Sequence, residues 1–202
     1  MFVEQPLRSR VLTWLEQEVP PARVQHILRV EAMAIELAEH HGVDARQAAQ
    51  AALMHDLAKN FSPKRLLEMA QAQGMELDPV DELNPHLLHA DIGAVIARNE
   101  FGVQDPEVLG AIANHTLGQP NMSPVSCIVF LADTLEPGRG DTAVLQQLRA
   151  MSTQNLLRAV WMTCDYSIQY LLETARLIHP RALQTRNWFL SSDRKRAIPK
   201  HG

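Results

Sequence analysis

The chain has 202 residues, of which 46% are hydrophobic and 21% are charged, and its formal net charge is −4. This length suits one domain with a substantial core, and the longest apolar runs, such as C-I-V-F-L-A, are too short to cross a bilayer. The net charge argues against a large nucleic-acid interface. The first residues do not resemble a secretory signal, and Cys127 and Cys164 lie far apart among apolar or small residues. We therefore expect a cytoplasmic protein with buried free thiols and with no nucleic-acid or membrane partner.

The first two predicted helices cover residues 8–19 and 21–41. Each range carries apolar residues at helical spacing, and a pair of prolines ends the first helix and suits the first turn of the second. Gly42 follows the second range as a suitable C-cap. His26 lies beside the apolar stripe of this helix, so its side chain should point inward, as a hydrogen-bonded core histidine or as a ligand.

An adjacent histidine and aspartate, His55 and Asp56, lie in the alanine- and leucine-rich string A-A-L-M-H-D-L-A-K. With Asp44 as the N-cap, the spacing predicts a mostly buried helix over this string. An unpaired polar side chain in such a helix is costly. The pair alone fits two interpretations: a bonded core histidine with a solvent-facing aspartate, or a metal site.

The middle of the chain adds another histidine-bearing helix. A short helix is expected after Ser62, and the string M-E-L-D-P-V-D-E-L-N-P that follows it predicts a mobile loop, where substrate could enter. The next helix places His89 on one face with Gly93, which would let a neighbouring helix approach closely. His86, one turn earlier, is a rival for any role given to His89.

Two further segments carry polar residues on apolar helices. A helix over residues 105–115 aligns His115 with its apolar positions. The run V-S-C-I-V-F-L-A-D-T-L-E-P-G-R has the composition of a strand, but in an otherwise helical chain we expect a buried helix. Asp133 then lies on a helix that is apolar on nearly every side, where a lone carboxylate needs a charged partner or a metal.

The C-terminal part is predicted to contain helices over residues 142–151 and 153–178, followed by a polar tail, S-S-D-R-K-R-A-I-P-K-H-G, with a frayed, solvated end. The whole chain is predicted to be an all-α helical bundle. In it, an N-terminal helix within residues 1–20 packs on a core of residues 21–180, and residues 181–202 form a C-terminal segment and tail.

Six potential metal ligands occupy inward or strongly apolar positions on five predicted helices. Independent core histidines would not require so many polar groups on inner faces, so the set indicates a shared metal site. Because a carboxylate has two oxygens, Asp56 can bridge two ions. The pattern therefore predicts a two-metal centre. The six residues are His26, His55, Asp56, His89, His115 and Asp133.

The order H…HD…H…H…D resembles the HD-domain metal-dependent phosphohydrolases. Longer strings are similar to those of the YqeK-type symmetrical bis(5′-nucleosyl)-tetraphosphatases: R-V-Q-H-I-L-R-V, A-A-L-M-H-D-L-A-K, L-L-H-A-D-I-G-A, A-I-A-N-H-T-L-G-Q-P-N-M-S and F-L-A-D-T-L-E-P-G-R. The resemblance runs from Arg23 to the T-R-N near residue 187. It implies a helical HD fold with a di-iron-type centre that hydrolyses diadenosine tetraphosphate to two ADP.

The resemblance also implies a division of the ligands between two divalent ions. Iron is the expected metal, while manganese and zinc suit the same mixture of imidazole and carboxylate. One ion would be held by His26, His55, Asp56 and Asp133, and the other by Asp56, His89 and His115.

Cations near these ligands are candidates for binding the substrate phosphates. They are Arg23, Lys59 and Arg139, each of which could instead be a solvated surface cation. Asp56 and Lys59 are the expected catalytic residues. Asn114 and Thr116 flank His115 and could orient ligands or substrate, or could cap the helix end.

Two alternative functions stay open on the sequence alone. The first is an HD phosphohydrolase that acts on another nucleotide, such as a nucleoside triphosphate or a cyclic dinucleotide. The second is a metal-stabilised module that binds nucleotides without turnover. In each case the expected partner is a small nucleotide, and a homodimer is left open.

Overall fold

The computed structural model describes residues 2–197, which contain α-helices and two 3-10 turns and no β-strand, so the all-α prediction is confirmed. None of these helices is both long and apolar enough to cross a membrane. The helices, in chain order, are α1 (Gln5–Glu18), α2 (Pro21–His41), α3 (Ala45–Met54), α4 (Pro63–Ala72), α5 (Pro79–Leu83), α6 (His89–Phe101), α7 (Pro106–Asn114), α8 (Pro124–Leu135), α9 (Ala143–Gln154), α10 (Leu156–Glu173) and α11 (Pro180–Ala197), with 3-10 turns η1 (Pro85–Leu88) and η2 (Pro137–Arg139).

Most helices begin where the sequence provides a proline or a side-chain cap. Proline occupies the first turn of α2, α4, α7 and α8, where a missing N–H costs nothing. The carboxylate of Asp44 accepts hydrogen bonds from two N–H groups at the start of α3, as predicted. At the other end, Gly42 closes α2 with a φ of 64°, a conformation that favours glycine.

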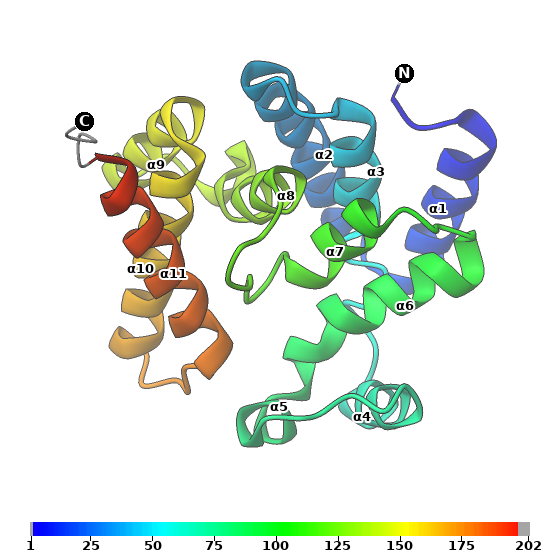
Figure 1. Cartoon of the computed structure of the whole chain (residues 1–202). Coiled ribbons are helices and arrows are strands. Elements are labelled where there is room, and N and C mark those ends of the chain that lie inside the picture. Colours follow the sequence, from blue (N-terminus) through cyan, green and yellow to red (C-terminus); the bar gives the residue numbers. More distant parts are fainter. Residues whose placement is uncertain (1, 198–202) are drawn as a thin grey trace.

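Four helices, α2, α3, α7 and α8, pack together in the middle of the bundle, and five of the six predicted ligands lie on them or just after their last residues. Figure 1 shows α1 and α6 on one side of this group, and α9, α10 and α11 on the other. The run predicted as a buried helix rather than a strand is α8, and nine of its twelve residues are buried. Cys127 and Cys164 are buried free thiols, as expected.

Two predictions for the middle of the chain need correction. The string A-A-L-M-H-D-L-A-K is helical only to Met54, and His55–Asn60 forms a series of turns. The predicted loop contains the short helix α5, which is stabilised by a capping box: Asp78 accepts from the chain N–H groups that follow, and Asp81 accepts from the N–H of Asp78.

The C-terminal helices also differ from the prediction. Instead of one helix over 153–178, α9 extends to Gln154 and Asn155 caps a new helix, α10, that ends at Glu173. The tail expected to fray is helical as far as residue 197, because α11 packs along α10 and buries Phe189 completely. Residues 198–202 of that tail lie outside the described part of the chain.

Candidate metal centre

Three of the predicted ligand histidines lie at helix ends rather than on the inner faces of helices. His55 and His115 directly follow the last residues of α3 and α7, and His89 is the first residue of α6. Each donates its Nδ1–H to the backbone carbonyl three residues earlier. This hydrogen bond fixes the tautomer, so all three rings present an unprotonated Nε2 to the same interior space.

Asp56 lies between these imidazoles with its two oxygens facing different groups. Its Oδ2 is 3.2 Å from Nε2 of His55. Its Oδ1 is 3.4 Å from Nε2 of His89 and 3.8 Å from Nε2 of His115. The side chain is 1% exposed. A carboxylate in this position can bind two cations, one through each oxygen.

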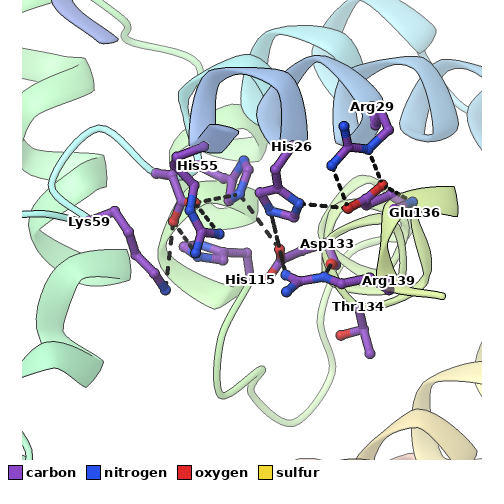
Figure 2. Close-up of polar contacts among 12 residues, drawn as sticks. His26, Arg29, His55, Lys59, His115, Asp133, Thr134, Glu136 and Arg139 are labelled. Atoms are coloured by element: carbon purple, nitrogen blue, oxygen red, sulfur yellow. Dashed lines mark hydrogen bonds and ion pairs between the residues drawn. The ribbon is translucent and has the colours of Figure 1, made fainter. Parts of the chain in front are cut away.

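His26 and Asp133 close the centre from α2 and α8. Nε2 of His26 is 2.9 Å from Oδ1 of Asp133, which in turn is 3.7 Å from Nε2 of His55. The other ring nitrogen of His26 donates to Glu136 over 2.9 Å. Figure 2 shows His26, His55, His115 and Asp133 pointing toward one centre.

The arrangement of these atoms fits divalent cations. Ligand atoms lie within 4.8 Å of one another in three groups, which share members. Nε2 of His55 and Oδ1 of Asp56 are buried without a hydrogen bond, and such groups are costly unless a ligand satisfies them. Two acceptor nitrogens, those of His89 and His115, are only 3.1 Å apart. The three groups are His26, His55 and Asp56; His55, His115 and Asp133; and Asp56, His89 and His115.

Metal binding needs neutral imidazole and ionised carboxylate, and the pKa shifts of His115 and Asp56 favour these states. The pKa of His55 is raised instead, because Asp56 and Asp133 outweigh the effect of its burial. Burial and the nearby His55 and His89 hold the pKa of His115 well below its usual value. Burial acts to raise the pKa of Asp56, but the neighbouring His55, His89 and Lys59 outweigh it and hold that pKa well below its usual value.

Three predicted cations surround the ligands. Nη1 of Arg23 is 3.2 Å from Oδ2 of Asp56, and Nη2 of Arg139 is 2.7 Å from Oδ1 of Asp133. Nζ of Lys59 is 3.0 Å from Nε2 of His89, to which it can donate. All three side chains are between 30% and 38% exposed. They therefore combine contact with the ligand cluster and access to solvent, as phosphate-binding cations require.

The remaining predicted residues separate into those at the centre and those away from it. Thr116 is at the centre, with its Oγ1 3.3 Å from Nε2 of His89. Asn114 is not, because its side chain donates to Ser126 inside the core and links α7 to α8. His86 belongs to none of the ligand groups, and its backbone carbonyl accepts from His89.

Glu136 was missed as an individual residue, although it is part of the string F-L-A-D-T-L-E-P-G-R. Its carboxylate is 1% exposed and accepts from His26, from Arg29 and from the N–H of Gly138. Burial acts to raise the pKa of Glu136, but these donors outweigh it and lower that pKa to about 2. The available signal was its position three residues after Asp133, which brings it to the same side of the helix end.

The family model for the HD domain matches residues 23–138, which is more than half of the chain. This chain belongs to the HD-domain family. The match spans all six predicted ligands and two of the three cations, Arg23 and Lys59. Arg139 lies one residue beyond the match, which ends before α9.

Relatives that match over nearly their whole length point to one group of proteins within the HD-domain family. A Bacillus subtilis protein named symmetrical bis(5′-nucleosyl)-tetraphosphatase is 35% identical over 91% of this chain and 98% of its own length. One of the same name from Halalkalibacterium halodurans is 34% identical over 91% of this chain and 97% of its own length. A crystal structure of a predicted HD superfamily hydrolase involved in NAD metabolism, from Clostridium acetobutylicum, matches with a TM-score of 0.87 at 32% identity and covers 91% of this chain and 97% of that one.

Proposed function

We propose that this HD-domain protein hydrolyses diadenosine tetraphosphate symmetrically to two ADP. The observation that carries the proposal is the placement of Asp56. Its two oxygens face different imidazoles, and the three cations described above lie around this centre. The names of the relatives from Bacillus subtilis and Halalkalibacterium halodurans support the substrate and the symmetry of cleavage. A small polyanion, rather than a nucleic acid, also suits a chain with a net charge of −4 that places Arg23, Lys59 and Arg139 around one centre.

Two divalent ions would occupy the centre. Iron is the expected metal, and manganese and zinc are alternatives. Bound ions of this kind lower the pKa of a bound water and neutralise charge on phosphate oxygens. Such ions bind neutral imidazole and ionised carboxylate, and the lowered pKa values of His115 and Asp56 favour these states in those two residues. One ion would be held by His26, His55, Asp56 and Asp133, and the other by Asp56, His89 and His115.

The protein's own part in the reaction is to hold the tetraphosphate in line. Lys59 lies beside His89 and Asp56, while Arg23 and Arg139 lie beside the carboxylates of Asp56 and Asp133. These cations would bind the phosphates and stabilise the charge that develops on them. The oxygen of water forms a bond to a phosphorus next to the central bridging oxygen. The bond between this phosphorus and the central bridging oxygen breaks, and the bridging oxygen leaves as part of the second ADP. The protons of the water pass to the products or to solvent.

The test is a product assay with purified protein and ferrous iron or manganese. Diadenosine tetraphosphate should give ADP alone. AMP with ATP would contradict symmetric cleavage. A panel containing nucleoside triphosphates and cyclic dinucleotides, ranked by kcat/KM, would show whether another nucleotide is the better substrate.

A separate test concerns the metal centre itself. Elemental analysis of the protein as purified should find close to two metal ions per chain. Asp56→Asn should lose most of both, because it removes the shared ligand, and should abolish hydrolysis. His115→Ala should lose one ion together with activity, whereas a non-catalytic module would keep its biological role without that ion. Asp141→Asn, at an exposed aspartate, is the matched control.

A further inference from the structure

A cavity of about 430 Å³ lies between the HD core and the C-terminal helices. Its core side includes Phe130 of α8, and its other side is formed by α10 with Tyr166, Ile168 and Leu171. The lining is mainly apolar and aromatic, and the volume falls in the range of small-molecule sites. Tyr170, at the same wall, is 50% exposed.

This cavity adjoins the metal centre at two points. Thr116 lines it and also contacts His89 over 3.3 Å. Arg139 lines it and also contacts Asp133 over 2.7 Å. Figure 2 shows Arg139 beside Asp133, and Thr134, another lining residue, extending away from the ligand cluster. A molecule in the cavity can therefore reach the ligands of both proposed ions.

A second cavity, of about 370 Å³, adjoins the centre from the other side of Arg139 and has a different character. It is lined by three arginines, Arg23, Arg29 and Arg139, together with His26 and other polar groups. Arginines of this kind suit phosphate oxygens. The two cavities thus present an apolar, aromatic wall and a cationic wall, with Arg139 shared between them.

We propose that the cavity beside α10 binds one nucleoside of the substrate, while the phosphates pass Arg139 and the metal centre toward the arginine-lined cavity. This proposal rests on the proposed function and specifies how its substrate is recognised. A purine base offers flat apolar faces that pack on aliphatic and tyrosine side chains. The hydroxyl groups of Thr116, Thr134 and Ser167 give the ribose and the base edges polar partners.

The wall formed by α10 and α11 lies beyond residues 23–138, the part that matches the HD family model. Residues 164–182 of this wall therefore lie outside the matched part. The division assigns the two tasks to different parts of the chain: the core supplies the metal ligands, and the C-terminal helices select the nucleoside. It also makes the two halves of a symmetric substrate bind in unequal surroundings.

The test compares ADP with methyl diphosphate, which carries the diphosphate without the nucleoside. Binding of each to the manganese-loaded protein is measured by calorimetry. The wild type should bind ADP more tightly. Ala182→Phe, which fills the cavity from α11, should weaken ADP binding about tenfold or more and leave methyl diphosphate binding unchanged. The control is Ala32→Phe, in a cavity of about 410 Å³ that contains none of the six ligands.

Unchanged ADP affinity in Ala182→Phe, or equal affinities of the wild type for both ligands, would overturn the assignment. If Ala182→Phe loses binding of methyl diphosphate as well, then Tyr170→Ala decides, because this exposed side chain can be removed without opening the core. The product assay separates the two proposals. If the protein binds ADP selectively but does not form it, the cavity assignment stands and the proposed function fails. If it forms ADP but both variants bind ADP like the wild type, the proposed function stands and the cavity assignment fails.

Discussion

At the scale of single residues, the centre depends on how each imidazole is held. His55, His89 and His115 donate Nδ1–H to backbone carbonyls, while His26 donates to the carboxylate of Glu136. Each ring is thus held through its Nδ1, and its Nε2 faces the other groups of the centre. The residue types and their order along the sequence predicted which side chains meet. Glu136 could not be predicted in the same way, because its role depends on where α8 ends relative to α2.

Lys59→Met tests the role of the cation that lies beside His89 and Asp56. Without the ammonium group, about 3.0 Å from His89 and 3.8 Å from Asp56, the substrate phosphates lose a charged donor. We expect kcat/KM for diadenosine tetraphosphate to fall about 100-fold, the usual scale for one such donor, with metal content unchanged. Lys64→Met, at a side chain that is 85% exposed, is the control and should have no effect. Equal kinetics in both variants would remove Lys59 from the site.

Glu136→Gln tests the carboxylate behind His26. The amide keeps the size of the side chain but removes the charge that orients His26 and pairs with Arg29. We expect metal affinity to fall about 10-fold to 100-fold, as for other groups that hold a ligand histidine. Competition with a chelator at constant pH measures this directly. Glu39→Gln, on the exposed side of α2, should bind metal like the wild type. A Glu136→Gln protein with unaltered metal affinity would contradict the argument.

At the scale of elements, sequence signals predicted where helices start better than where they stop. Prolines and N-cap residues such as Asp44 predicted where helices begin, because these signals depend only on neighbouring residues. The end of α3 was missed, since A-A-L-M-H-D-L-A-K has good helix formers on both sides of the break. What stabilises the turn comes from elsewhere: Trp14 of α1 donates to the carbonyl of Leu57, and α6 packs on the carbonyl of His55 through Gly93.

Gly93→Ala tests that close approach. A Cβ at this position would lie 3.3 Å from the carbonyl oxygen of His55 and 3.4 Å from Ile112, so α6 and the turn would have to separate slightly. Gly110→Ala, in α7, is the matched control, because a Cβ there meets nothing within 4 Å. Urea unfolding should show Gly110→Ala stabilised by up to about 1 kcal/mol, the helix-propensity gain, and Gly93→Ala destabilised relative to it. Equal shifts in both would show that the turn tolerates the methyl group.

Asp193→Asn tests the link between α10 and α11, which the sequence did not predict. Burial acts to raise the pKa of Asp193, but hydrogen bonds from Arg158, Trp161 and Asn155 outweigh it and lower that pKa. Because the pKa of this carboxyl is lower in the folded than in the unfolded protein, its ionised form stabilises the fold at any pH above the ordinary pKa of aspartate. This stabilisation is lost as the pH falls through the lowered pKa. Urea unfolding at pH 7 should show a loss of about 1 to 3 kcal/mol, and the difference from wild type should shrink in acid. A pH-independent difference would contradict this.

At the scale of the molecule, polar contacts join the C-terminal helices to the HD core. His179, just before α11, lies 3.3 Å from Asp81 of α5. Within α11, Thr185 donates to the carbonyl of Leu117, and Arg181 forms two hydrogen bonds with Asp91 of α6. These contacts hold α11, which begins at Pro180, against the rest of the chain, and the boundary at residue 180 stays a prediction.

The last prediction concerns the Arg181–Asp91 ion pair. Exchanging the two charges keeps the pair attractive, so it distinguishes the effect of the contact from the effect of either charge alone. The two side chains meet at 3.1 and 3.3 Å and are each about one-quarter exposed. Arg181→Asp places two carboxylates opposite each other and should move α11 away from α6, opening the cavity beside Leu87 and Ala182. We expect KM for the dinucleotide to rise about tenfold with metal content unchanged, since a repulsion of that kind costs on the order of 1 kcal/mol. Adding Asp91→Arg restores an attractive pair and should recover most of the lost affinity. If the double variant binds substrate as weakly as the single one, then α11 does not shape the cavity through this contact.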